Sequence, residues 1–205
     1  MTPEYWQQAC RQLSRRDVVF RKLIKAYPGI TLRSRNDAFH TLCRAIVGQQ
    51  ISVKAADSVW LRFAAAVEAV KPGHVLKTPT EQLRAAGLSG RKVEYLQDLA
   101  RHFHEGLIIE AQWPKLTDDE IIADLVRVKG IGRWSAEMFL MFYLLRPNVA
   151  PLDDIGLQRA IQIQYNKGEP LSRAEMRTIA ESWRPWSTVA TWYLWRSLEP
   201  VPVEY

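Results

Sequence analysis

Signals that begin an α-helix recur along the whole chain, and they constrain its fold more than any other feature. Thr117-Asp-Asp-Glu120 and Ser172-Arg-Ala-Glu175 have the form of a capping box, in which the first and fourth residues satisfy each other's backbone N–H groups. Thr78-Pro-Thr-Glu81 has the same form, with Pro79 at the first helical position. Alternating strand patterns are scarce, so the sequence predicts an all-α chain. Single capping residues are expected at Asp37, Ser52 and Ser89.

Proline and glycine residues interrupt the chain between these segments, and no Gly/Ser linker or repeat divides it. We therefore expect a single domain over residues 1–205, built of about ten short helices in two lobes around a cleft. The expected sub-lobes are residues 38–145, and residues 1–37 together with 146–205. The main interruptions are Pro28-Gly29, Pro72-Gly73, Trp113-Pro114, Arg146-Pro147, Gly168 to Pro170 and Arg184-Pro185.

The charge and composition of the chain exclude several classes of protein. The chain carries 28 Lys and Arg against 22 Asp and Glu, a net charge of +6, which favours nucleic acid as a partner. No apolar run reaches the ~18 residues that span a bilayer, and the N-terminus lacks the basic and then apolar pattern of a signal peptide. Cys10 and Cys43 are too few for a four-thiolate zinc site or an iron–sulfur cluster. We expect a cytoplasmic protein, associated with the nucleoid if bacterial, without a metal site.

A glycine-containing hairpin between two predicted helices is the most informative segment. Gly130 and Gly132 permit a very tight turn, and Ile131 between them can anchor it in the core. The backbone N–H groups of such a turn, beside the start of a helix, suit a phosphate. Lys129 and Arg133 add positive charge at the same point. A plain connection between helices has a similar glycine pattern, but the full run from residue 125 to residue 138 favours phosphate binding.

Two adjacent carboxylates follow the second helix of this hairpin, within residues 149–157. That helix, of ~12 residues, is ~18 Å long. The residues from Arg146 to Leu152 span at most ~23 Å when extended. The loop can therefore run back along the helix and return Asp154 near Trp134. Asp153 and Asp154 then precede a new helix, and one of them is expected to be its N-cap, since a cap needs only one carboxylate.

Several segments resemble, in order, the helix–hairpin–helix DNA glycosylase superfamily. Residues 125–138 look like its hairpin signature, and residues 149–157 resemble its aspartate loop. The resemblance covers roughly residues 36–198. Three further segments are similar to the alkylpurine branch, the 3-methyladenine DNA glycosylase II family: Ala45 to Ala56, Gly87 to Leu96, and Trp183 to Trp186.

This resemblance implies an enzyme of base-excision repair, a DNA glycosylase of the 3-methyladenine glycosylase II type. Such an enzyme flips an alkylated purine, of the 3-methyladenine or 7-methylguanine type, out of double-stranded DNA. It hydrolyses the N-glycosidic bond and leaves an abasic site, while a carboxylate stabilises the positive charge on the sugar. That catalytic carboxylate aligns with Asp154, so Asp153 is expected to cap the helix or to support Asp154. Trp134 stands where relatives that also cut the DNA backbone have a lysine, which implies a monofunctional hydrolase.

The resemblance also implies which residues hold the DNA. Trp134, Trp195 and Met138 are expected to line the base pocket, where aromatic faces attract a cationic base. Some relatives have an aromatic residue in place of Met138, which leaves the base preference open. Gln50 occupies the wedge position that fills the gap in the duplex, and Gln49 is expected either to contact DNA or to be a solvated loop residue. We expect Trp183 and Trp186 to pack in the hydrophobic core.

Two other functions are compatible with these residues. One is a glycosylase for deaminated or oxidised bases, and the other is a non-catalytic protein that binds DNA through the hairpin alone. Asp154 and the Val149-Ala-Pro-Leu segment before it favour the enzyme, because a binding module does not need them. We expect damaged double-stranded DNA as the partner, no membrane association, and a monomer. No cofactor is expected, although the hairpin is compatible with a bound monovalent cation.

Overall fold

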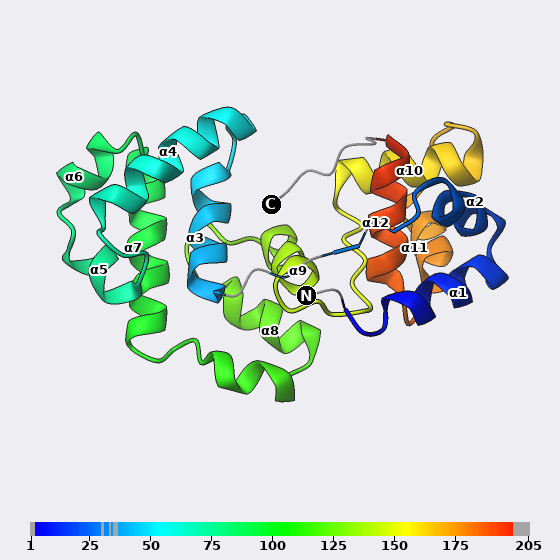
Figure 1. Cartoon of the computed structure of the whole chain (residues 1–205), viewed down its shortest axis with the longest axis horizontal. Coiled ribbons are helices and arrows are strands. Elements are labelled where there is room, and N and C mark those ends of the chain that lie inside the picture. The colour runs from blue at the N-terminus through cyan, green and yellow to red at the C-terminus, as the bar shows by residue number, and fades with distance from the viewer. Residues whose placement is uncertain (1–2, 30, 33, 35–36, 199–205) are drawn as a thin grey trace. The chain divides into compact units, whose positions relative to one another are not determined.

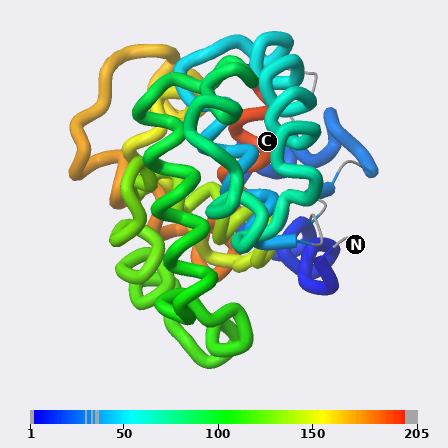
Figure 2. Tube along the Cα trace, turned by 90° about the vertical axis from the view of Figure 1, so that its left-hand side faces the viewer, coloured from blue at the N-terminus to red at the C-terminus, as the bar shows by residue number. Residues whose placement is uncertain are grey.

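The computed structural model describes residues 3–29, 31–32, 34 and 37–198. These residues are helical, with short connections and no strand among them, so the all-α prediction is confirmed (Figures 1 and 2). They form 13 helices, somewhat more than expected, because short helices occur where the sequence predicts loops. In chain order the elements are α1 (Trp6–Arg16), α2 (Val18–Ala26), α3 (Ala38–Gly48), α4 (Val53–Ala66), α5 (Pro72–Lys77), α6 (Thr80–Ala85), α7 (Gly90–His104), the 3-10 helix η1 (Glu110–Lys115), α8 (Asp118–Leu125), α9 (Arg133–Phe142), α10 (Ile155–Asn166), α11 (Arg173–Glu181) and α12 (Ser187–Leu198).

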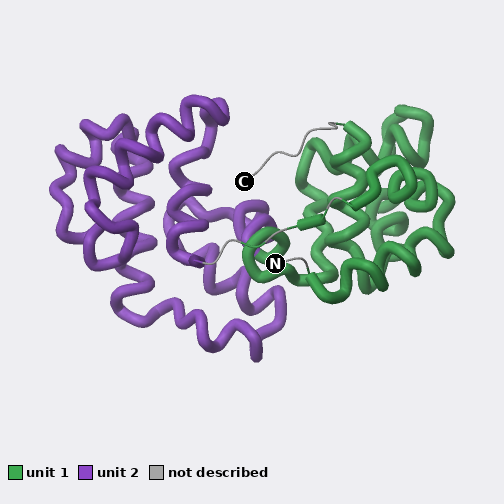
Figure 3. The backbone as a smooth tube through the Cα atoms, viewed as in Figure 1, with its two compact units in different colours: residues 1–34, 140–204 green, residues 35–139, 205 purple. Residues whose placement is uncertain are grey.

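The chain divides into two compact units (Figure 3). Unit 1 contains residues 1–34 and 140–204, and unit 2 contains residues 35–139. The second division falls inside α9, rather than near residue 145 as the sequence predicts. The reason is packing, because Phe142 in the last turn of α9 lies against the hydrophobic core of unit 1.

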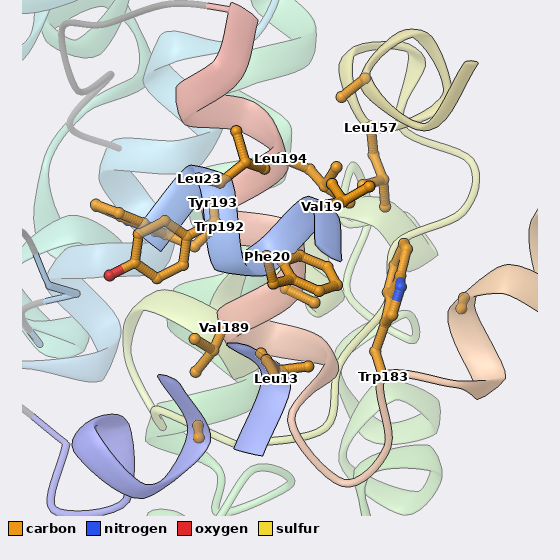
Figure 4. Packing of buried hydrophobic residues seen from close by; sticks show 14 of the residues in the cluster. Leu13, Val19, Phe20, Leu23, Leu157, Trp183, Val189, Trp192, Tyr193 and Leu194 are labelled. Carbon is orange, nitrogen blue, oxygen red and sulfur yellow. The ribbon is translucent and has the colours of Figure 1, made fainter. Parts of the chain in front are cut away.

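Large aromatic side chains lie among aliphatic ones in the core of unit 1 (Figure 4). Trp6 of α1 lies edge-on to Trp192 of α12, with ring centroids 5.5 Å apart, and Phe20 of α2 lies edge-on to Trp183 at 5.9 Å. Trp183 is fully buried, and Trp186 is half-buried against the same cluster. Both tryptophans therefore pack in the core, as the sequence predicts.

The helix α7 is the centre of unit 2, where α3, α5 and α6 pack against it (Figure 1). Leu96 and Leu99 of α7 are fully buried, and Phe103 meets Phe39 of α3 edge-on, with ring centroids 5.3 Å apart. Since α3 leads into the loop that contains Gln49 and Gln50, this packing determines where that loop begins.

Cap hydrogen bonds confirm most of the predicted helix starts. The capping boxes at Thr117 and Ser172 are complete. The box predicted at Thr78 is wrong, because α6 starts after Pro79 without a side-chain cap and the Thr78 hydroxyl donates to the His74 carbonyl. A residue before proline favours an extended conformation, which leaves Thr78 at the end of α5, next to the last carbonyls of that helix. The predicted single caps are confirmed at Asp37, Ser52 and Ser89.

No helix among the described residues combines the length and the apolar character needed to cross a membrane. Within the same residues, no group of three His, Cys, Asp or Glu side chains is arranged to hold a metal ion. Cys10 and Cys43 are buried thiols, and burial raises the pKa of both.

Candidate active site and nucleic-acid interface

The hairpin (residues 126–132), which joins α8 to α9, turns at Gly130. The φ of Gly130 is +81°, in the left-handed region that glycine adopts without strain. A Cβ atom here would lie 2.2 Å from Cδ2 of Tyr95, so the close approach of the turn to α7 also requires glycine. Ile131 is 5% exposed and anchors the turn in the core, as the sequence predicts.

The sequence predicts that Gly130 and Gly132 together permit the tight turn, but only Gly130 has a left-handed φ. The φ of Gly132 lies outside the left-handed region, and a Cβ atom would meet nothing within 4 Å. The carbonyl of Gly132 accepts the first backbone bond of α9, from Ala136. A residue without a side chain at this exposed helix start leaves the backbone N–H groups open to a phosphate.

Lys129 and Arg133 flank the turn, and both side chains are more than half exposed. The Lys129 ammonium forms an ion pair with Glu94, and this hydrogen bond raises the pKa of Lys129. Arg133 contacts Glu137 at 3.1 Å and Asp119 at 3.4 Å. Glu94 and Asp119 are more than half exposed, so water screens these two pairs, whereas Glu137 is nearly buried. Lys129 can therefore exchange Glu94 for a phosphate, and Arg133 can exchange Asp119 for one.

Gln49 and Gln50 begin the wedge loop (residues 49–52), which joins α3 to α4. The exposed Gln50 has a φ of +58°, a left-handed conformation that is strained in a residue with a Cβ atom. The half-buried Gln49 donates its side-chain amide to the Gly130 carbonyl at 2.8 Å. Gln49 is thus bound to the hairpin rather than solvated.

Asp154 is the N-cap of α10, where its Oδ1 accepts the Leu157 N–H at 2.7 Å. Of the two roles expected for Asp153, the cap is wrong, because Asp154 directly precedes the first helical residue. Support of Asp154 by Asp153 stays a prediction. Asp153 is exposed and forms an ion pair with Arg173 of α11. Of the two carboxylates, the half-buried Asp154 is the one that the start of the helix orients.

Trp195 of α12 approaches the same carboxylate. Its indole Nε1 donates to Oδ1 of Asp154 at 2.9 Å. Its ring lies parallel to Phe142, with centroids 6.1 Å apart and 8° between the planes. The sequence predicts only a stacking face for a base at Trp195. The structure adds a hydrogen bond, so that two N–H donors meet on one oxygen of Asp154.

Two residues beside Asp154 were not predicted from the sequence. A Cβ atom on Gly156 would lie 3.1 Å from Oδ1 of Asp154 and 3.6 Å from the Trp195 ring, so glycine lets the indole reach the carboxylate. Gln158 donates to the Leu152 carbonyl at 2.8 Å and holds the loop before Asp154. Gly156 carries a usable signal, because a glycine within a helical pattern needs a packing reason.

Trp134 and Met138 lie four residues apart on α9, within unit 2, and therefore share one face of that helix. Trp134 is 38% exposed, whereas Met138 is 7% exposed. Asp154 and Trp195 belong to unit 1. The structure thus brings Asp154 and Trp195 together, and the expected proximity of Asp154 to Trp134 stays a prediction.

Known proteins resemble this chain over most of its length. DNA-3-methyladenine glycosylase 1 of Schizosaccharomyces pombe is 30% identical over 180 residues, which cover 86% of this chain and 79% of that protein. The crystal structure of a DNA-3-methyladenine glycosidase from Bacillus halodurans has a TM-score of 0.87 and 32% identity, covering 93% of this chain and 89% of that one. A 3-methyladenine DNA glycosylase from Schizosaccharomyces pombe, in complex with abasic DNA, has a TM-score of 0.80 and 29% identity, covering 96% and 100%.

The similarity extends to a family model. The chain spans 64% of the length of one Bacillus subtilis relative that is 30% identical to it. Residues 43–185, which include the wedge loop, the hairpin and Asp154, match the model for HhH-GPD superfamily base excision DNA repair proteins. The chain belongs to the HhH-GPD superfamily of base excision DNA repair proteins.

Proposed function

We propose that this protein is a monofunctional DNA glycosylase that excises alkylated purines from double-stranded DNA and leaves an abasic site. The observation that carries the proposal is the Asp154 carboxylate, held by the Leu157 N–H and the Trp195 indole. Hydrolysis of a glycosidic bond passes through a sugar that carries positive charge, and a fixed carboxylate stabilises that charge. The names of similar proteins, which are 3-methyladenine glycosylases, support alkylated purines as the substrate.

The leaving group needs little assistance in this reaction. Alkylation at a ring nitrogen makes the purine cationic, so a strong general acid is not required. The indole faces of Trp195 and Trp134 suit such a base, because the ring quadrupole attracts positive charge. Asp154 then acts on the sugar and on the attacking water, and the cationic base leaves in neutral form.

The remaining predicted residues act on the DNA. The target base must leave the duplex to reach the carboxylate, and Gln50 fills the gap that it leaves. The hairpin, with Lys129 and Arg133, binds backbone phosphates and sets the register without reading sequence. Trp134 has no amine, so the protein forms no imine with the sugar. We further propose that it works as a monomer, in the cytoplasm, without a cofactor.

Release of bases from methylated DNA tests this proposal. Duplex DNA treated with a methylating agent is incubated with the protein, the released bases are separated by chromatography, and the DNA is then treated with alkali. We expect free 3-methyladenine or 7-methylguanine, and strand breaks only after alkali.

Duplexes that contain hypoxanthine or 8-oxoguanine measure the other lesion classes in the same assay. Release of these bases alone would mean that the substrate is a deaminated or oxidised base and not an alkylated purine. Tight binding without release from any duplex would make the chain a DNA-binding protein without catalysis.

A further inference from the structure

The helix α7 carries three side chains that hold the hairpin and the end of α3, which leads into the wedge loop. Lys92, Tyr95 and Asp98 follow one another at intervals of three residues, so they are neighbours along the helix surface. The wedge loop, the hairpin and α7 all lie in unit 2. The three contacts therefore lie within one compact unit.

Lys92 holds the end of α3, just before the wedge loop begins. Its Nζ donates at 2.7 Å to the carbonyl of Val47, in the last turn of α3, where carbonyl groups lack a partner within the helix. Burial lowers the pKa of this ammonium group. The side chain is thus directed into the protein, and it closes the end of α3 just before Gln49.

Tyr95 and Asp98 hold the hairpin. The ring of Tyr95 packs directly under Gly130. Asp98 is 6% exposed, and its Oδ2 accepts the backbone N–H of Lys129 at 2.9 Å. Its other oxygen pairs with Arg101. The turn is therefore bound to α7 at Lys129 and packed against it at Gly130.

Gln49 joins the two loops directly, through the 2.8 Å hydrogen bond from its amide to the Gly130 carbonyl. The next residue, Gln50, is the strained one, with a φ of +58°. A strained backbone conformation persists only where the surroundings hold it. The Gln49 amide supplies that support from the side of the hairpin, and the Ser52 cap of α4 supplies it from the other side.

We propose that Gln49 is a positioning residue for base flipping. Its bond to Gly130 keeps the wedge loop at a fixed place relative to the phosphate-binding hairpin, so that Gln50 enters the duplex where the flipped base leaves a gap. The inference rests on the proposed function, because the role of Gln50 as the wedge belongs to it. Gln49 acts through Gln50 and adds nothing to phosphate binding.

Gln49→Met, which keeps the length of the side chain and removes the donor, tests this role. The probe is a duplex with a tetrahydrofuran abasic-site analogue opposite 2-aminopurine, whose fluorescence rises when a side chain unstacks it. We expect the fluorescence change at saturating protein to show that insertion of Gln50 is about tenfold less favourable in Gln49→Met than in the wild type. The reason is that one well-formed hydrogen bond is lost. Affinity for undamaged duplex should stay within about twofold.

Gln82→Met is the matched control. The Gln82 amide also donates to a backbone carbonyl, that of Ala66, at 3.0 Å in the same unit, but away from both loops. We expect this variant to insert like the wild type. In a Gln50→Ala background, Gln49→Met should have no additional effect, because a positioning residue cannot act without the residue that it positions.

Wild-type insertion by Gln49→Met would overturn the proposal. An equal loss of affinity for damaged and undamaged duplex in Gln49→Met would also overturn it, by making Gln49 a direct DNA contact. Full additivity of Gln49→Met and Gln50→Ala would overturn it as well. Should Gln49→Met fail to fold, Gln49→Glu replaces it, since a carboxylate cannot donate to the Gly130 carbonyl, and wild-type insertion by that variant would also overturn the proposal.

The probe contains no glycosidic bond to cleave, so its readout is independent of excision. A wild-type protein that inserts into this duplex but releases no base from methylated DNA would refute the proposed enzyme and leave the role of Gln49 intact. Suppose instead that the wild type excises normally and the Gln49→Met variant inserts like the wild type. This result would refute the role of Gln49 and leave the proposed enzyme intact.

Discussion

At the scale of single residues, two N–H donors orient the Asp154 carboxylate. The backbone N–H of Leu157 comes with the start of α10, and the indole N–H of Trp195 is supplied by α12, 41 residues further along the chain. Hydrogen bonds to a charged group contribute about 1.5–3 kcal/mol each. Loss of the indole donor should therefore lower the rate of the chemical step.

Replacement of Trp195 separates its two roles. Trp195→Phe keeps an aromatic face beside Phe142 and removes the N–H, so we expect single-turnover excision to slow about tenfold for cationic 7-methylguanine and neutral hypoxanthine alike. Trp195→Ala also removes a stacking face worth roughly 1–3 kcal/mol, and the further loss should be larger for the cationic base. If both variants slow both bases by one common factor, Trp195 does not contact the base.

Trp134 determines whether the protein can also cut the DNA backbone. An indole cannot form an imine with the sugar, and imine formation is what a lysine at this position provides. We expect borohydride treatment of the protein with an abasic-site duplex to trap no covalent complex, as judged by gel electrophoresis. Trp134→Lys serves as the comparison. Efficient trapping by the wild type would contradict the monofunctional assignment.

At the scale of elements, the two glycines of the hairpin have different roles. Gly130 is needed by the fold, since its φ is +81° and a side chain would meet the Tyr95 ring, whereas Gly132 has open space around it. The exposed start of α9 is therefore available for a ligand that approaches the backbone closely.

Alanine at each position distinguishes these roles. We expect Gly130→Ala to destabilise the fold by about 1–3 kcal/mol or more, because a left-handed φ is strained for alanine and the Cβ displaces Tyr95. Gly132→Ala should unfold like the wild type but bind damaged and undamaged duplex more weakly. Thermal unfolding and duplex titrations measure the two effects. A Gly132→Ala variant with unchanged duplex affinity would argue against phosphate binding at this turn.

Short-range signals made the helix starts predictable. A capping residue and its partner lie three residues apart, so Thr117 and Ser172 could be recognised from the sequence alone. The errors have local causes as well. Thr78 precedes a proline and bonds backward, and Asp153 and Asp154 are chemically equal until the position of the first helical turn is known.

Contacts between distant segments could not be predicted in this way. Gln49 and Gly130 are 81 residues apart, and their bond depends on how α3 and the hairpin pack against α7. The bond from Trp195 to Asp154 likewise requires α12 to pack beside α10, with Gly156 leaving room. The sequence predicts Gln49, Asp154 and Trp195 through a family resemblance, but only the folded chain shows what they touch.

At the scale of the whole molecule, the net charge of +6 favours association with DNA phosphates. We expect Lys129→Ala to weaken binding to all duplexes equally and to reduce the slope of log affinity against log salt concentration by about one. Lys77→Ala, an exposed lysine on α5 of the same unit, is the matched control and should leave the slope unchanged. Equal slopes for the Lys129→Ala variant and the wild type would show that Lys129 makes no phosphate contact.

Single-turnover excision by Asp154→Asn tests the catalytic assignment most directly. Asparagine has the same size and is an equally good N-cap, so the start of α10 should persist and binding to an abasic-site duplex should be kept or tightened. We predict that release of 7-methylguanine slows by at least about a hundredfold, whereas Asp153→Asn, which loses only an exposed ion pair, stays within about threefold of the wild type. An Asp154→Asn variant that excises within tenfold of the wild-type rate would contradict the account.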